Sequence, residues 1–170
     1  MADLFLTDSK GRYHRVCFQA FGMSCGPASV AMVERLYKHL NQSDEQRALD
    51  LSVRYPGGFT MDGGTYSRNL SSVLNAEGVK AYQSTNVGSE SVYSYLKCYS
   101  SFATPVIAHV RWANNAGAHF VVCAISDSDD TFVFYDPWFG IVEVAGWQFP
   151  NYYTSDGSGT FSGFLVITYR

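Results

Sequence analysis

Residues 19–40 read QAFGMSCGPASVAMVERLYKHL, a segment that predicts the first long helix and, with it, the position of a cysteine. From Cys25 on, apolar side chains recur at helical spacing: Val30, Val33, Tyr37 and Leu40. This pattern predicts an amphipathic helix whose apolar stripe faces a core. Pro27 falls in the first turn, where its missing N–H costs no hydrogen bond. The segment therefore places Cys25 at the N-terminus of a helix.

Helical patterns continue through the first hundred residues. One covers residues 43–53 and starts with Ser-x-x-Gln, the spacing of a capping box. A second covers about 65–78 and ends in a glycine, which favours the end of a helix. A weaker one spans about 89–97. The Gly- and Pro-rich stretch 56–64 lies between two of these patterns, so we interpret it as a loop inside one domain.

After residue 104 the sequence changes to β-branched and aromatic runs, which predict strands. The runs are 106–112, 119–126, 131–136, 141–144 and 161–169. Helices first and strands afterwards predict an α+β fold, in which an N-terminal helical part packs on a C-terminal antiparallel sheet. The length of 170 residues suits a single domain over residues 1–170.

Composition excludes several classes of protein. The chain has 12 Lys and Arg against 15 Asp and Glu, a formal net charge of -3, which argues against nucleic acid as the main partner. Its longest apolar runs fall far short of the ~20 residues of a membrane helix. The first residues lack the basic and apolar regions of a general secretory signal. We therefore expect synthesis in the cytoplasm, with export by a specialised route left open.

The sequence contains no motif for a metal or a cofactor. The four cysteines lack the Cys-x-x-Cys spacing of a zinc site. A phosphate loop and a dinucleotide fingerprint are both missing, so we expect no metal and no organic cofactor. Cys17, Cys98 and Cys123 are interpreted as core packing. The acidic cluster 127–130 lacks the spacing of a calcium loop and is interpreted as a solvated turn.

Cys25 is the candidate nucleophile. A helix N-terminus carries unpaired N–H groups and a partial positive charge, and both favour the thiolate that attacks a carbonyl carbon. Such a thiolate works with a proton-transfer partner, and the chain has four histidines. His14 and His39 have polar neighbours and are expected at the surface, whereas His109 is expected to be a satisfied histidine within the sheet. His119 stands at a strand end beside a loop and is the candidate base.

Asp136 is the candidate acid that orients this base. If a four-residue turn follows Ser126, then Ser126 pairs with Thr131, and counting back places His119 opposite Trp138. Asp136 is then two residues away on the same face of the sheet. That diagonal is ~7–8 Å between backbones, a separation that Asp and His side chains can bridge.

Two further kinds of side chain are candidates for the site. Acyl transfer needs donors directed at the developing oxyanion. The side-chain amide of Gln19, six positions before Cys25, can converge there with the backbone N–H of the cysteine. Trp112 and Trp138 stand at strand ends near the proposed site, where they either line a substrate cleft or pack at its rim.

Three blocks of the sequence are similar, in order and in context, to one known family. They are Gln19 followed by CGPA at 25–28, then GAHFVV at 117–122, then YDPWFG at 135–140. On these blocks the chain resembles papain-like cysteine peptidases of the C39 and C39-like type, over about residues 19–144. The aromatic-rich segment 146–170 departs from the pattern of that family.

The resemblance implies a papain-like fold and a role for each residue. Cys25 is then the nucleophile and His119 the general base. Asp136 orients the base, and Gln19 lies in the oxyanion hole. The implied enzyme cleaves a peptide bond in a protein or peptide substrate and needs no cofactor. Members fused to transporters cleave leader peptides after Gly-Gly. The stand-alone form also resembles papain-like effector toxins of bacteria, which implies a cognate immunity protein that covers the cleft.

Two kinds of alternative stay open. The same triad can serve a deamidase, a transglutaminase or a peptidoglycan amidase, because an acyl-thioester forms from several kinds of amide. The other alternative is a papain-like module that binds a peptide without cutting it. A binding role does not require the complete set of Cys25, His119, Asp136 and Gln19.

Overall fold

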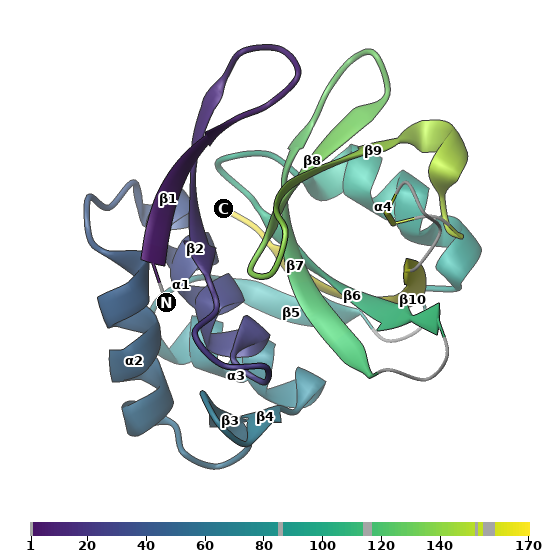
Figure 1. Cartoon of the computed structure of the whole chain (residues 1–170). Coiled ribbons are helices and arrows are strands. Elements are labelled where there is room, and N and C mark those ends of the chain that lie inside the picture. The colour runs from purple at the N-terminus through teal and green to yellow at the C-terminus, as the bar shows by residue number, and fades with distance from the viewer. Residues whose placement is uncertain (1, 85–86, 114–116, 152, 155–158) are drawn as a thin grey trace.

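A six-stranded antiparallel sheet with the order β5-β10-β6-β7-β8-β9 organises the chain (Figure 1). The computed structural model describes residues 2–84, 87–113, 117–151, 153–154 and 159–170. The strands of this sheet are β5 (Ala81–Ser84), β6 (Val106–Trp112), β7 (Ala118–Ser126), β8 (Thr131–Asp136), β9 (Gly140–Ala145) and β10 (Gly159–Thr168). The strand runs in the second half of the sequence are thus confirmed to within a few residues.

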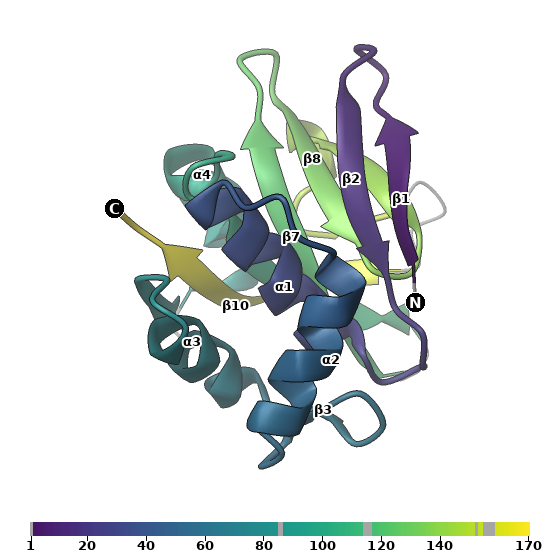
Figure 2. The ribbon, with the colours of Figure 1, turned by 90° about the vertical axis from the view of Figure 1, so that its left-hand side faces the viewer.

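Helices precede and flank this sheet. They are α1 (Cys25–Lys38), α2 (Asp44–Arg54), α3 (Ser67–Ala76) and α4 (Val92–Tyr99), with short 3-10 turns η1 (Ser89–Ser91) and η3 (Gly146–Gln148). α2 begins as predicted, since the Ser43 side chain accepts the backbone N–H of Gln46. α1 lies against β7, where Ser29 donates its hydroxyl to the Phe120 carbonyl at 3.2 Å (Figure 2).

The sheet is buried on both faces, because alternate residues of its strands enter two separate cores. On one face, Val122 and Val133 pack with buried side chains of α1, α2 and α3. On the other face, Val121 and Phe132 pack with Val92 and other residues of α4. These two layers of helix on one sheet confirm the predicted α+β, papain-like architecture, in which the N-terminal helices pack on a C-terminal sheet.

Three small β elements are not predicted by the sequence patterns. They are the N-terminal hairpin of β1 (Ala2–Thr7) and β2 (Tyr13–Phe18), the ribbon of β3 (Phe59–Thr60) and β4 (Gly64–Thr65), and the edge strand β5. In β2 the apolar Tyr13 is 82% exposed while the polar His14 is buried. The usual alternation of apolar residues inward and polar residues outward is therefore reversed at the start of this strand, which hides the strand signal.

The prediction that His14 lies at the surface is wrong. His14 is 2% exposed. One ring nitrogen, Nε2, lies 2.9 Å from Asp8 Oδ2, and the other, Nδ1, lies 2.9 Å from the Tyr135 hydroxyl. Because both ring nitrogens have partners, the imidazole is accommodated in the interior. His39, in contrast, is exposed at the end of α1, as predicted.

The three cysteines that were expected in the core do not behave alike. Cys17 and Cys123 are fully buried, which confirms the prediction for them. Cys98 is exposed on α4, so the prediction is wrong for this residue. The buried face of α4 is formed by Val92 and Leu96, and a residue two positions after Leu96 points away from that face.

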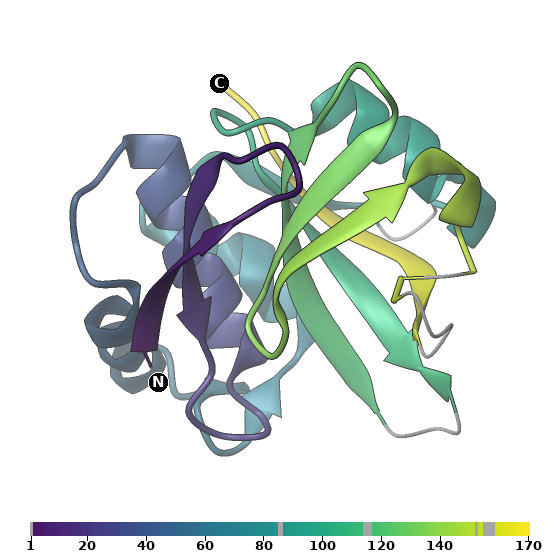
Figure 3. The ribbon, with the colours of Figure 1, turned by 45° about the horizontal axis from the view of Figure 1, so that its top comes forward.

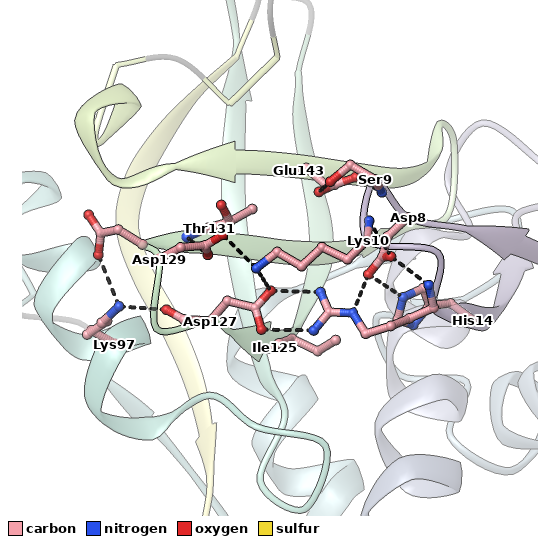
Figure 4. Close-up of polar contacts among 12 residues, drawn as sticks. Asp8, Ser9, Lys10, His14, Lys97, Ile125, Asp127, Asp129, Thr131 and Glu143 are labelled. Carbon is pink, nitrogen blue, oxygen red and sulfur yellow. Dashed lines mark hydrogen bonds and ion pairs between the residues drawn. The ribbon is translucent and has the colours of Figure 1, made fainter.

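The N-terminal hairpin runs beside β8 and β9 (Figure 3). An ion-pair network attaches it to the turn between β7 and β8 (Figure 4). Arg12 donates two hydrogen bonds to Asp127, at 2.8 and 2.7 Å, and a third from Nε to Asp8, at 2.6 Å. Lys10 Nζ lies 2.9 Å from Asp127 and 2.7 Å from Asp129. The acidic turn is therefore not simply solvated, because basic side chains of the hairpin neutralise it. Within the described residues, no group of three acidic, His or Cys side chains could hold a metal ion.

Asp8→Ala is expected to lower the free energy of unfolding by about 3 kcal/mol, because it removes the buried acceptor of His14 and Arg12. The matched control is Asp129→Ala in the same network. Asp129 is exposed, so its ion pair contributes little to stability, and we expect unfolding close to that of the wild type. Urea denaturation at neutral pH measures both variants. Equal losses in the two variants would contradict a dominant role of Asp8.

Candidate active site

Cys25 is the first residue of α1 and is 7% exposed. A tight turn leads into it, because the Ser24 hydroxyl accepts the N–H of Phe21 at 3.2 Å and donates to its carbonyl at 2.9 Å. After Cys25 the helix passes so close to β4 that a side chain at Gly26 would collide with Thr65. These local constraints hold the thiol at the helix N-terminus, beside the β3–β4 ribbon.

His119 and Asp136 form a buried hydrogen-bonded pair. His119 Nε2 lies 2.8 Å from Asp136 Oδ1, and the two residues are 2% and 0% exposed. Cys25 lies close enough to His119 to favour the protonated form of the imidazole. The structure therefore brings three of the four predicted site residues together, with the imidazole between a thiol and a carboxylate.

The predicted strand register is wrong at the turn between β7 and β8 and correct near His119 and Asp136. Ser126 pairs with Phe132, not with Thr131, because the turn takes one more residue, with Asp130 in the left-handed conformation (φ 70°). A β-bulge between Cys123 and Ile125 then shifts the register back by one residue. The end of the strand pair that carries the site therefore has the predicted diagonal, although the turn end does not.

Charge interactions fix the protonation of this pair. Burial acts to lower the pKa of His119, but hydrogen bonds with Asp136 and Cys25 outweigh it and raise this pKa to about 9. Burial acts to raise the pKa of Asp136, but hydrogen bonds from His119 and Tyr153 hold it below its usual value. At neutral pH the site therefore contains an imidazolium next to an ionised carboxylate.

Asp136 has further donors, one of which the sequence patterns do not predict. Its Oδ1 also accepts the backbone N–H groups of Trp138, at 2.6 Å, and Phe139, at 3.0 Å. Its Oδ2 accepts the hydroxyl of the fully buried Tyr153 at 2.7 Å. Tyr153 lies outside the three sequence blocks on which the resemblance rests, and it is one tyrosine among 12. No sequence signal separates it from the others.

Gln19 is tied to the site through its backbone. Its N–H donates to the Pro137 carbonyl at 2.7 Å, which links the segment before Cys25 to the residue after Asp136. Its side-chain Nε2 donates to the Phe21 carbonyl at 2.8 Å, and its Oε1 is buried without a partner among the described residues. In this arrangement the amide is occupied by the loop, so its place in an oxyanion hole stays a prediction.

Aromatic side chains enclose the imidazole. The Trp112 ring stacks on His119, with centroids 5.6 Å apart and an angle of 28° between the planes. Trp138 approaches His119 edge-on at 6.4 Å and is 55% exposed. Trp112 therefore packs on the histidine, whereas Trp138 contributes to the rim. An apolar cover of this kind keeps water away from the His119–Asp136 bond and strengthens it.

Two cavities open at this site. One, of about 230 Å³, is lined by residues 18–22 together with Pro137 and Trp138. The other, of about 300 Å³, is lined by Cys25 itself. Its remaining lining residues are Gly22, Met23, Gly64, Thr65, Tyr66, Ser67, His109, Ala118 and Phe120. The reactive thiol therefore has space beside it for a substrate.

Comparison of the sequence with models of protein families shows to which family this chain belongs. The model of the Peptidase_C39 like family matches residues 13–159. The chain belongs to this family. The match includes Cys25, His119 and Asp136, and it extends beyond the C-terminal end of the resemblance seen in the sequence motifs. It includes Tyr153, so the buried tyrosine falls inside the matched region.

A solved structure with a similar fold agrees with the assignment to the C39-like family. A double-glycine motif protease from an AMS/PCAT transporter, in complex with its leader peptide, is 25% identical with a TM-score of 0.58, over 91% of each chain. The Pseudomonas avirulence protein AvrPphB is 11% identical with a TM-score of 0.42, over 85% of this chain and 89% of its own. Comparison with curated protein sequences gives no match. Every helix in the described part of this C39-like chain is too short or too polar to span a membrane.

Asp136→Asn is expected to lower the pKa of His119 from about 9. The substitution removes the negative charge that stabilises the imidazolium, whereas burial, which favours the neutral ring, remains. NMR titration of the His119 ring measures this change, and Asp50→Asn at an exposed position is the matched control. An unchanged pKa in Asp136→Asn would show that the carboxylate does not set the protonation of His119.

The same shift predicts a dependence of stability on pH. The pKa of His119 is higher in the folded chain than its ordinary value of 6.5. Its bonds therefore stabilise the fold fully below pH 6.5, and this contribution is lost as the pH rises to about 9. We expect the wild type to lose stability over this range relative to Asp136→Asn, as urea denaturation at several pH values would show. Parallel pH profiles of the two proteins would contradict this linkage.

Proposed function

We propose that this C39-like protein is a cysteine peptidase that hydrolyses a peptide bond in a protein substrate through a Cys25–His119–Asp136 triad. The observation that supports it most is the imidazole of His119, which is hydrogen-bonded to the buried Asp136 at 2.8 Å and lies near enough to Cys25 for the thiol to raise its pKa. A cation beside a thiol at a helix N-terminus favours the nucleophilic thiolate. The family and its peptidase members support the same chemistry.

The reaction follows from these positions. The Cys25 thiolate attacks the carbonyl carbon, and as the C–N bond breaks, His119 donates a proton to the departing amine. Water then attacks the thioester, giving its proton to His119, and the C–S bond breaks to release the acid. Asp136 keeps the imidazole in one orientation throughout. Gln19 completes an oxyanion hole with the Cys25 N–H if its amide leaves the Phe21 carbonyl.

The substrate is a peptide or an extended segment of a protein. The similar double-glycine motif protease was solved with its leader peptide, which makes cleavage after Gly-Gly one hypothesis for this chain. The cavity beside Cys25 has more volume than a glycine would fill.

As a biological setting we propose a bacterial effector toxin, made in the cytoplasm and exported by a specialised secretion system into a target cell. Such a producer needs an immunity protein that covers the cleft. A protein of this kind should co-purify with the chain and protect Cys25 from alkylation. Harmless expression of the active chain in a cell without an inhibitor would contradict the toxin role.

The thiol test uses an internal control that the structure supplies. Cys98 is exposed, whereas Cys25 is 7% exposed. An ordinary thiol at Cys25 would therefore react more slowly with iodoacetamide than Cys98 does. We expect Cys25 to react about tenfold faster, because a neighbouring cation and a helix N-terminus activate a thiol as a nucleophile. His119→Ala should abolish this advantage without changing Cys98. Peptide mapping by mass spectrometry after brief exposure measures both rates.

Loss of peptidase activity should follow the same residues. Cys25→Ser should remove activity, and His119→Ala should reduce it by about 10²–10⁴. If Cys25 reacts no faster than Cys98 and is indifferent to His119, the peptidase proposal fails, and a module that binds peptides without cutting them is left. If a reactive Cys25 forms a thioester only with glutamine side chains or cell-wall amides, the enzyme is a deamidase, a transglutaminase or a peptidoglycan amidase and not a peptidase.

A further inference from the structure

A second histidine lies in the Cys25 cavity and takes no part in the triad. His109 is on β6, and its side chain lines the cavity of about 300 Å³ together with Cys25. Its Nδ1 lies 2.6 Å from the hydroxyl of Ser162. Ser162 belongs to a bulged part of β10, where the register against β6 shifts between Phe161 and Leu165. Bulges next to sites commonly redirect a side chain, and here the bulge presents Ser162 to His109.

The backbone of the bulge fixes the position of Ser162. Gly163, next to Ser162, has φ +82° and lies directly against the Val87 carbonyl, where no side chain fits. The Ser162 hydroxyl accepts the N–H of Phe164 at 3.3 Å. Among the described residues it has no other acceptor, so its own hydrogen points to His109 Nδ1. The remaining proton of the neutral imidazole is then on Nε2.

His109 is therefore a neutral donor at the cavity wall. Burial lowers the pKa of His109 to about 4, and the charges of Arg111 and His119 act in the same direction. Within the described part of the chain, Nε2 has no hydrogen-bond partner, and it is not one of the atoms sealed from solvent. The cavity thus contains one N–H group that a ligand can use.

The rest of the cavity determines what kind of ligand fits. Met23, Tyr66, Ala118 and Phe120 give it mainly apolar walls, which disfavour a charged group. Its volume of about 300 Å³ is far more than a glycine would fill. An unbranched side chain of medium length fits better, with an acceptor at its tip for His109.

The position of the cavity indicates which part of the substrate enters it. His119 donates its proton to the leaving amine, so that amine lies on the side of Cys25 where His119 and Trp138 meet. Ala118 and Phe120 line the His109 cavity and leave β7 on the face opposite His119. The cavity therefore receives the acyl part of the substrate, which stays attached to Cys25.

We propose that His109, held by Ser162, is a specificity-determining residue that selects an Asn or Gln side chain in the acyl part of the substrate. This inference rests on the proposed peptidase function for the direction of the peptide. It also distinguishes this chain from a double-glycine protease, because a substrate with glycine next to its terminal residue would leave the His109 cavity empty.

The experiment measures alkylation of Cys25 by three peptidyl chloromethyl ketones that end in glycine and carry Gln, Met or Gly before it. Gln and Met have nearly the same length and differ in the acceptor. Chloromethyl ketones react with thiols whether or not the protein turns over peptides, so the ratios report the cavity alone. All proteins carry Cys98→Ser to remove the exposed thiol. Hydrolysis of matching peptides is measured separately and tests the proposed function.

The Gln probe should react roughly tenfold faster than the Met probe in the wild type, the effect of one hydrogen bond to a neutral donor. His109→Phe should bring this ratio to about one. Ser162→Ala, a smaller change, should reduce the ratio of the Gln rate to the Met rate. Equal rates for Gln and Met in the wild type, a ratio that survives both substitutions, or fastest reaction of the Gly probe would overturn the proposal. Selective alkylation without hydrolysis would refute the peptidase function and leave this inference standing.

Discussion

The buried bond between His119 and Asp136 is the constraint on which the rest of this structure depends. An ionised carboxylate with no exposure to water is tolerated only when its oxygens are fully satisfied, and here four donors meet on one side chain. They come from β7, from the turn after β8 and from the segment that leads into β10. A local pair of side chains therefore determines how three distant parts of the chain must meet.

Ion pairs and a backbone hydrogen bond hold the N-terminal hairpin to the strands that carry His119 and Asp136. The hairpin is attached at its tip, by Arg12 and Lys10, to the turn between β7 and β8. At its base the chain continues into Gln19, whose N–H is bonded to Pro137. The hairpin that leads into Gln19 is thus fixed at its tip to the turn between β7 and β8 and at its base to the residue after Asp136. The nucleophile and its base belong to one connected frame.

The parts of this fold that the sequence predicts are those with strong local signals. The start of α1 at Cys25 follows from Pro27 and a long apolar stripe, and the capped start of α2 follows from Ser43. The two errors at His14 and Cys98 have different causes. His14 is buried because the Asp8 carboxylate and the Tyr135 hydroxyl satisfy it, which periodicity does not reveal. Cys98 is exposed because α4 buries only one narrow face, and the helical spacing from Leu96 accounts for its position.

The pairing of His119 with Asp136 shows a subtler limit. Simple counting gives the right neighbours only because a bulge cancels the extra residue of the turn. Tyr153 has no signal at all, since its partner is fixed only when the whole sheet is assembled.

The place of β10 in the sheet has a kinetic consequence. This strand is formed by residues 159–168, yet it lies between β5 and β6, in the interior of the sheet. A nascent chain therefore exposes the edges of β5 and β6 until these late residues have left the ribosome, and pairings this distant in sequence close slowly. Tyr153 and Ser162 reach their places in the same step. The cleft is thus completed only after residues 159–168 have been made, which gives the producing cell an interval in which the earlier residues exist without the assembled site.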